Sequence, residues 1–322
     1  MTTNRTVNAQ RSADLELVSA KVAESSARLK QLHECTPEEA RAMRAERGNP
    51  FAPAACPTVA VVADEIPFND SALPVRRYTP ESCANAAAPA LVYYHGGGYV
   101  LGDLEQYDTL CQQLANAADC IIVSVDYTLA PEAKSQQIFD EAYTAYCWLK
   151  KEGAAWGIDT SRLAVGGDSA GGNLATAVCL MCKESGFPKP IFQLLWYPVT
   201  DYSMGFASVD EFADGYFLTK ASMQWFASHF LEAPERGADP RVSPMLAELS
   251  TLPPAFVLTA GFDPLRDEGE AFARRLVEAG VSCRHVCYTD TIHAFISFAG
   301  AIEAGKEAIA ESGQELRKAF AG

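Results

Sequence analysis

Short apolar segments rich in β-branched residues alternate with amphipathic segments along most of this chain. The apolar segments predict strands at residues 59–66, 74–79, 90–94, 120–125, 162–166, 191–196, 255–260 and 283–288. The amphipathic segments predict helices at residues 106–118, 136–152, 171–184, 221–232 and 267–280. This alternation is typical of an α/β fold with a mostly parallel central sheet and helices on both of its faces. Because no helix separates the first strands, we expect an antiparallel edge there.

Two regions depart from this alternation. Residues 1–50 are polar and helical in pattern, with a helix start at Thr36 and a stop at Gly48. Residues 200–250 carry several aromatic side chains and helix-like pieces but no clear strand. We therefore expect an N-terminal helical cap segment at residues 1–50 and a main domain at residues 51–322, with a cap insertion around residues 200–250. Both cap parts would cover the sheet edge where open α/β sheets bind ligands.

The most specific motif in the chain is Gly167-Asp-Ser-Ala-Gly171, which lies between a predicted strand and a predicted helix. A G-x-S-x-G pattern in this strand–turn–helix context is typical of a nucleophile elbow. Small residues allow the tight turn, and the N-terminus of the helix points at the serine hydroxyl. We therefore expect Ser169 to be a catalytic nucleophile and Asp168 to orient the elbow or a glycine loop. A plain serine–glycine turn is the alternative interpretation.

A run of glycines, His95-Gly96-Gly97-Gly98, directly follows the predicted strand 90–94. Consecutive glycines allow bare backbone N–H groups to turn toward a ligand. Acyl transfer needs such donors where the oxyanion of the tetrahedral intermediate forms. The run lies upstream of the serine motif, where the other half of an oxyanion hole is expected. A flexible glycine loop is the alternative interpretation.

A serine nucleophile needs a base, which should lie at the same edge of the sheet. The chain has five histidines. Of these, His33, His229 and His285 fall in segments with a helical or strand pattern, and His95 belongs to the glycine run. His293 lies in a short loop after the last predicted strand, from which it can reach the serine. We therefore expect His293 to be the base.

The acid that orients this base should also end a strand, between the serine and the histidine in the chain. Asp263 lies at the end of the predicted strand 255–260 and is followed by a proline. Asp267 and Glu268 are nearby alternatives, but they fall at the start of the next helix, where carboxylates commonly cap helices. We therefore expect Asp263 to be the acid of a Ser-His-Asp triad.

Four motifs together resemble the hormone-sensitive-lipase-like branch of the α/β hydrolases. They are HGGGYVLGD at residues 95–103, DYTLAPE at residues 126–132, GDSAGGN at residues 167–173 and DPLRDEG at residues 263–269. The similarity extends from about residue 60 to the C-terminus, and the detail of the motifs is most similar to bacterial acetyl esterases. The resemblance implies an α/β-hydrolase fold with a helical cap, and a serine carboxylesterase that prefers short acyl chains.

The resemblance also implies roles for individual residues. Ser169, His293 and Asp263 would act as nucleophile, base and acid on a small-molecule ester, through an acyl-enzyme intermediate. The backbone N–H groups that bind the oxyanion would come from Gly97, Gly98 and Ala170. The supporting positions of these motifs would be His95, Gly96 and Asp168. The family further suggests a homodimer, and it implies neither a metal ion nor an organic cofactor.

Two departures from the family pattern concern loops. The segment Ala133–Gln137 lacks the prolines that commonly follow the APE motif, and Ala294 stands where many members have glycine after the histidine. Neither position belongs to the predicted triad. Both shape loops that decide how a substrate fits.

Charge and composition narrow the range of partners. The 26 basic and 41 acidic residues give a net charge of −15, which disfavours binding to nucleic acid or to an anionic membrane. The N-terminal sequence has no apolar stretch like that of a signal peptide, and no segment is long enough to span a bilayer. We therefore expect a cytoplasmic protein with reduced cysteines. No residues have the spacing of a zinc site.

Three other functions are compatible with the same fold. An amidase or a deacetylase of small molecules would use the same triad, and a non-catalytic small-molecule receptor would have a broken one. A long-chain lipase would need a large exposed apolar lid; residues 1–50 are too polar for one, which leaves the insertion at residues 200–250 as the place for it. The presence of all three expected triad residues favours an enzyme over a receptor.

Overall fold

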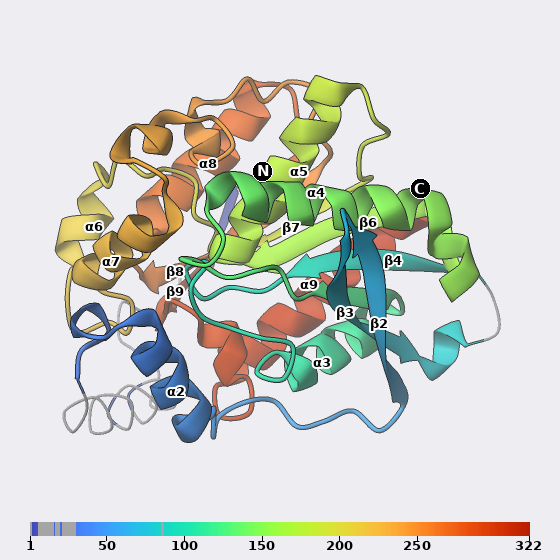
Figure 1. Ribbon diagram of the computed structural model, residues 1–322, viewed down its shortest axis with the longest axis horizontal. Helices are drawn as coiled ribbons and strands as arrows, with labels where there is room; N and C mark the ends of the chain where they lie inside the picture. Colours follow the sequence, from blue (N-terminus) through green and yellow to red (C-terminus); the bar gives the residue numbers. More distant parts are fainter. Residues whose placement is uncertain (1, 6–15, 17–19, 21–29, 85–86) are drawn as a thin grey trace.

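The computed structural model describes residues 2–5, 16, 20, 30–84 and 87–322 (Figure 1). Its centre is a nine-stranded sheet in the order β1-β9-β8-β7-β6-β4-β5-β3-β2. In chain order the strands are β1 (Thr2–Arg5), β2 (Val59–Phe68), β3 (Ser71–Pro80), β4 (Ala88–Tyr94), β5 (Ile121–Val125), β6 (Ile158–Asp168), β7 (Gln193–Trp196), β8 (Ala255–Phe262) and β9 (Cys283–Ile292). The β2–β3 and β3–β5 pairs are antiparallel and the other pairs are parallel. The predicted α/β fold and its antiparallel edge are therefore confirmed.

Helices cover both faces of the sheet (Figure 1). One layer contains α3 (Asp108–Ala118) and α9 (Glu303–Ala321), and the other contains α4 (Ser135–Glu152), α5 (Ala170–Ser185) and α8 (Arg266–Glu278). Side chains of one strand alternate between the layers, so Val92 of β4 packs in the core with α4 and α5, and Tyr93 packs in the core with α3 and α9. These two apolar cores fix the strands whose carboxyl ends carry the candidate site.

Most predicted elements are present with shifted ends, but two elements were missed. No helix was predicted at α9, although Ile309, Leu316 and Phe320 lie on its buried face together with alanine, glycine and serine. The prediction that residues 1–50 are helical is wrong for Thr2–Arg5, which pairs with β9. These four residues are polar, so no alternating apolar pattern marks them as a strand. Most of the predicted cap segment before residue 30 lies outside the described residues.

The described end of the N-terminal segment contains the 3₁₀ helix η1 (Leu32–Glu34) and the helix α2 (Pro37–Arg47). A capping box starts α2, because Thr36 Oγ1 accepts the N–H of Glu39 and the Glu39 carboxylate accepts the N–H of Thr36. Gly48, with φ 59°, ends the helix. The predicted start and stop of this helix are therefore confirmed.

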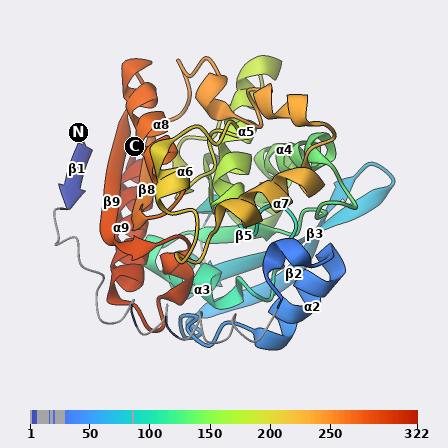
Figure 2. The same ribbon diagram turned by 90° about the vertical axis from the view of Figure 1, so that its left-hand side faces the viewer.

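The insertion between β7 and β8 contains α6 (Ala207–Glu211), α7 (Lys220–Phe230), η4 (Pro234–Ala238) and η5 (Pro244–Leu246), and no strand. Figure 2 shows α2, α6 and α7 on the same side of the molecule. The two parts touch, because Nε1 of Trp225 in α7 donates to the carbonyl oxygen of Cys35 at 3.1 Å. The N-terminal segment and the insertion therefore form one layer beside the ends of the strands.

The remaining 3₁₀ helices are η2 (Glu81–Cys83), η3 (Gly153–Trp156) and η6 (Phe295–Phe298), the last of which directly follows the loop after β9. Within the described ranges, none of the helices combines the length and the apolar character that crossing a membrane requires. The cysteines are free thiols, and most of them are buried.

Candidate active site

Ser169 occupies the sharp turn between β6 and α5. Its backbone angles are φ 55° and ψ −117°, a combination that residues with side chains rarely adopt. The flanking glycines are required by space, because a Cβ on either Gly167 or Gly171 would collide with the carbonyl oxygen of Tyr94. The turn holds the serine at the carboxyl end of β6 and at the N-terminus of α5, as in a nucleophile elbow.

The structure brings the three expected triad residues together. His293 follows β9, and its Nε2 lies 3.0 Å from Oγ of Ser169. On the other side of the ring, Nδ1 lies 2.7 Å from Oδ2 of Asp263, which directly follows β8. A carboxylate at Nδ1 favours the tautomer with the proton on that nitrogen, so that Nε2 offers a lone pair to the serine hydroxyl. This is the geometry that general-base activation of a serine requires.

Asp263 is fully buried and is held through both carboxylate oxygens. Its Oδ2 accepts from His293, and its Oδ1 accepts the backbone N–H of Leu265 at 2.9 Å. The carbonyl oxygen of the same aspartate accepts the N–H of Arg266 at 3.0 Å. The side chain and the backbone of this turn therefore fix each other.

The two alternative carboxylates point to other partners. Oδ2 of Asp267 accepts the backbone N–H of Ser208 at 3.0 Å. Oε1 of Glu268 accepts the N–H of Thr200 at 2.6 Å, in the loop that follows β7. Burial raises the pKa of Glu268 to about 8. The histidine is thus served by Asp263 and not by these neighbours.

Two residues beside the histidine were not predicted as site residues. The ring of Tyr197 meets the His293 ring edge-on at 4.9 Å between centroids and packs behind it. Ala294 has φ 65°, a left-handed conformation that glycine adopts more easily. The loop therefore accepts alanine at this position with some backbone strain.

The glycine run folds back on itself after β4. Gly97 and Gly98 have φ 114° and 61°. A side chain on Gly97 would collide with the carbonyl of Leu101, and one on Gly98 would collide with the ring of Phe226 from α7. In the part of the chain that the structure describes, neither glycine N–H has a protein acceptor. Ala170 is the first residue of α5, so its N–H also has no acceptor within the helix.

Asp168 ties the elbow to the glycine run. Its Oδ1 accepts the N–H of Gly96 at 2.8 Å and the hydroxyl of Tyr93 at 2.7 Å. Its Oδ2 accepts the hydroxyl of Tyr107 at 3.0 Å. Burial raises the pKa of Asp168, and the three donated hydrogen bonds oppose that rise. The contacts therefore give this carboxylate the geometry of a support rather than that of a group that reaches the histidine.

His95 is fully buried beneath the glycine run. Its Nδ1 lies 2.8 Å from the carbonyl oxygen of Gly96, and its ring stacks on Tyr127 at 4.4 Å. The Tyr127 hydroxyl also donates to the carbonyl oxygen of His95 at 2.8 Å. Burial lowers the pKa of His95 to about 4, so the ring is neutral at physiological pH. These contacts make His95 a prop for the loop.

Arg41 of α2 reaches the same loop from outside, and sequence reasoning did not single it out. Its Nε donates to the carbonyl oxygen of Val100 at 2.9 Å, and its Nη2 donates to that of Ala130 at 2.7 Å. A two-point ion pair with Glu132, at 2.7 and 2.8 Å, holds the guanidinium in place. Since the N–H of Ala130 donates to the carbonyl oxygen of Tyr99, the arginine braces both sides of this contact.

Among the residues that the structure describes, no three His, Cys, Asp or Glu side chains gather as a metal ion would require.

Comparison with known proteins identifies the family to which this fold belongs. A family described as alpha/beta hydrolase fold matches residues 91–297. The chain belongs to this family, in its hormone-sensitive-lipase-like branch. The resemblance inferred from the motifs is thereby confirmed.

Several relatives are named as ester hydrolases. The chain is 43% identical over 224 residues to the carboxylic ester hydrolase LipN of Mycobacterium tuberculosis. This alignment covers 67% of the chain and 59% of LipN, so the chain spans less than two thirds of the length of LipN. The chain is 40% identical over 240 residues to an ethyl acetate hydrolase of Pseudomonas putida. This alignment covers 74% of the chain and 76% of the hydrolase.

A solved structure gives the same result. The ester hydrolase EH1AB1 from the metagenome of Lake Arreo, in complex with a bipyridine phosphonate derivative, has a TM-score of 0.92 and 38% identity. The match covers 96% of this chain and 99% of that chain. The enzyme class predicted from the sequence, a carboxylic ester hydrolase, is confirmed by these relatives.

Proposed function

We propose that the protein is a serine carboxylesterase that hydrolyses small-molecule esters with short, acetyl-like acyl groups. The observation that carries this proposal is the unbroken contact from Asp263 through His293 to Ser169, with distances of 2.7 and 3.0 Å. The similarity to an ethyl acetate hydrolase supports the short acyl chain.

In the first half of the reaction, His293 takes the proton of the Ser169 hydroxyl as Oγ attacks the ester carbonyl. Asp263 holds the histidine tautomer and stabilises the imidazolium that forms. The developing oxyanion would be bound by the N–H groups of Gly97, Gly98 and Ala170. By analogy with removal of a single oxyanion donor in other hydrolases, each is worth about 3 to 4 kcal/mol. The imidazolium then protonates the departing alcohol, and Ser169 is left acylated.

In the second half, water replaces the alcohol. His293 takes a proton from the water as it attacks the acyl-enzyme carbonyl, and the same N–H groups bind the second oxyanion. Collapse of this intermediate releases the carboxylic acid and returns the proton to Ser169. Every step uses groups of this chain, the ester and water, so all atoms and protons are accounted for without a further reactant.

Our division of the chain is also a proposal. Residues 1–50 and the insertion around residues 200–250 would form the cap, and residues 51–322 the catalytic domain that bears it. The contact between Trp225 and Cys35 supports one continuous cap. We further propose a cytoplasmic enzyme that acts as a homodimer; gel filtration with light scattering would measure the molecular mass, and a monomer would contradict the dimer.

The test of function compares wild type with Ser169→Ala on p-nitrophenyl esters whose acyl chains range from about two to sixteen carbons. We expect the highest kcat/KM at the short end and a loss of at least about 10,000-fold in the variant, because the nucleophile is gone. Circular dichroism provides the control for folding. Residual activity of more than a few percent in the folded variant would contradict the role of Ser169, and a maximum at long chains would contradict the acyl preference.

A further inference from the structure

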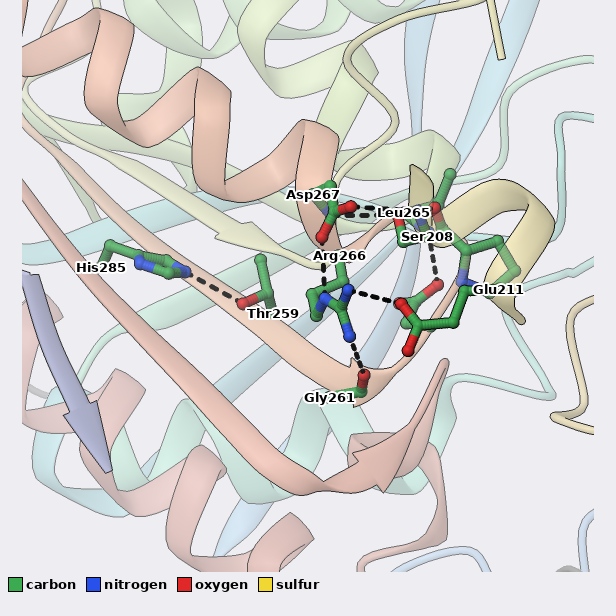
Figure 3. Close-up of polar contacts among 10 residues, drawn as sticks. Ser208, Glu211, Thr259, Gly261, Leu265, Arg266, Asp267 and His285 are labelled. Atoms are coloured by element: carbon green, nitrogen blue, oxygen red, sulfur yellow. Dashed lines mark hydrogen bonds and ion pairs between the residues drawn. The ribbon is translucent and has the colours of Figure 1, made fainter. Parts of the chain in front are cut away.

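The cap insertion contacts the turn that carries the acid. Ser208, a buried residue of α6, packs against the segment that follows Asp263 (Figure 3). The Ser208 hydroxyl donates to the carbonyl oxygen of Pro264 at 2.7 Å and accepts the backbone N–H of Asp267 at 3.2 Å. The Asp267 carboxylate in turn accepts the backbone N–H of Ser208 at 3.0 Å. The helix and the turn therefore hold each other through reciprocal hydrogen bonds.

Arg266 adds a second link between the same segments (Figure 3). Its Nη1 donates to the carbonyl oxygen of Gly261 at 3.1 Å, and its Nη2 donates to the Glu211 carboxylate in α6 at 2.9 Å. Its Nε donates to Asp267 at 2.8 Å, and its guanidinium lies 4.9 Å over the ring of Phe212. Because Gly261 lies before the acid and Arg266 after it, this side chain ties both sides of the turn to α6.

The position of this turn decides the position of the acid. Leu265 donates its backbone N–H to Oδ1 of Asp263, and Arg266 donates its N–H to the Asp263 carbonyl. A shift of Pro264 would carry the Leu265 N–H with it. The carboxylate would then rotate away from His293, with which it makes a 2.7 Å contact. A misplacement of about 1 Å at a catalytic group can reduce the catalytic rate about 100-fold even when every catalytic group is present.

We propose that Ser208 is a positioning residue for the acid: α6 of the cap insertion holds the turn 263–267 so that the Asp263 carboxylate stays aligned with His293. This inference rests on the proposed function, in which Asp263 orients the histidine. It gives the insertion a part in the chemical step in addition to covering the site.

The proposal also explains the spacing of the three carboxylates in the DPLRDEG motif. Asp263 bonds to the histidine after β9, Asp267 to α6, and Glu268 to the loop after β7. One short motif thus joins three segments that are far apart in the sequence. The two carboxylates that are not the triad acid would keep the first one in place.

The main experiment measures kcat and KM of Ser208→Ala and Ser208→Thr on p-nitrophenyl acetate. Active sites are first counted by titration with an aryl phosphonate, so that each rate is expressed per competent site. We expect kcat of Ser208→Ala to fall about tenfold with KM within about twofold of wild type, because the loss affects the chemistry rather than binding. Ser208→Thr keeps the hydroxyl and should retain most of kcat.

The matched control is Lys220→Met. Lys220 pairs with Asp210 at 2.6 Å within the same insertion, but this exposed ion pair does not reach the acid turn. Its kcat should stay within about twofold of wild type. A tenfold loss in this control would show that any disturbance of the insertion slows the enzyme, and it would overturn a specific role for Ser208.

A double-mutant cycle separates positioning from general support. If Ser208 acts through the acid, Ser208→Ala should cause no further loss of kcat once Asp263 is replaced by asparagine. An equal loss in both backgrounds would overturn the proposal, and so would a change in KM or melting temperature without a change in kcat. If Ser208→Ala does not fold, Arg266→Met takes its place in the same cycle, since it breaks the second link from a partly exposed position.

These experiments distinguish a failure of the proposed function from a failure of the positioning role of Ser208. If wild type is not titrated by the phosphonate and Ser169→Ala retains activity, the proposed function fails. If wild type is titrated and Ser169→Ala is inactive, the function stands, and the result for Ser208 then decides this inference alone.

Discussion

Two contacts hold the candidate site, one from α2 and one from the insertion between β7 and β8, and they differ in their physical character. Arg41 of α2 braces the glycine loop with a charged side chain that is 28% exposed and pairs with a Glu132 side chain that is 49% exposed. Ser208 of α6 braces the acid turn with a hydroxyl that is fully buried and neutral. One half of the site is thus held by a charged contact at the surface and the other by a neutral contact in the interior.

The difference implies that the two halves respond to different conditions. Salt screens an exposed ion pair but has little effect on a buried bond between neutral groups. The hydrogen bond from Arg41 lowers the pKa of Glu132, so the pair persists as the pH falls toward the ordinary glutamate range. We call the glycine loop the oxyanion side of the site and the turn 263–267 the acid side. We expect the oxyanion side to be sensitive to ionic strength and the acid side to be sensitive to packing. Four predictions test this comparison.

The largest effect is expected from Gly98→Ala on the oxyanion side. The new methyl group would collide with the Phe226 ring, and the positive φ adds strain, so the loop must move and carry its N–H donors away. We expect kcat to fall about 100- to 1,000-fold, the range found when one oxyanion donor is lost. The matched control is Gly157→Ala, which has φ 77° but open space around the Cβ. It should lower the melting temperature and leave kcat unchanged; equal losses in both variants would assign the effect to strain alone.

A smaller effect is expected from Arg41→Met, which removes the charged brace but keeps the length of the side chain. Two backbone carbonyls lose their donor, and we expect kcat to fall about tenfold, with a larger relative effect of salt on wild type than on the variant. Lys30→Met removes another exposed ion pair to α2, with Glu39, and serves as the control. Salt responses that are identical in wild type and Arg41→Met would contradict the distinction between the two halves.

Glu268→Gln tests the acid side through the pH dependence of stability. The pKa of Glu268 is raised to about 8 in the folded protein from an ordinary value of 4.5, so the folded state binds more protons between these values. The free energy of unfolding of wild type should therefore fall as pH rises from about 4.5 to about 8. Glutamine stays neutral and can still accept from Thr200, so the variant should lose this component. Urea unfolding at several pH values measures the free energy of unfolding of wild type and of Glu268→Gln. If the two free energies change with pH in the same way, the raised pKa of Glu268 is contradicted.

The smallest effect is expected from Ala294→Gly beside the base. Relief of the left-handed backbone strain at φ 65° favours glycine, whereas the greater freedom of the unfolded chain opposes it. We expect a gain of no more than about 1 kcal/mol in the free energy of unfolding, with kcat within about twofold. Thermal unfolding with parallel kinetics provides the measurement. A clear loss of stability would show that the methyl group contributes packing that outweighs the strain.

The predicted triad residues could be found because each is marked locally. Ser169 lies in a motif between a strand and a helix, and Asp263 and His293 each follow a strand. The parallel topology places all three at one edge of the sheet. The three side chains were therefore expected to meet even though Ser169 and His293 are 124 residues apart. The same reasoning identified Asp263 over Asp267 and Glu268.

The braces could not be found in this way. Arg41 bonds to residues 59 to 91 positions away, and Ser208 to residues 56 to 59 positions away. Arginine on an amphipathic helix and serine near a helix start are common and usually face water or cap the helix. Their partners are mostly backbone groups, which have no sequence signature. Only the packed structure shows which of these side chains meets which turn.

The order of the chain also sets when the enzyme can first act during its synthesis. The glycine loop and the elbow are synthesised first, the acid follows after β8 and the base after β9, and the helix α9 that completes one core comes last. A growing chain therefore carries its serine for more than a hundred residues without a base. Because the last strand, β9, also pairs with β1, residues near the two ends of the chain must meet before the sheet is complete. The proposed triad can therefore assemble only after β9 and the histidine that follows it have been synthesised.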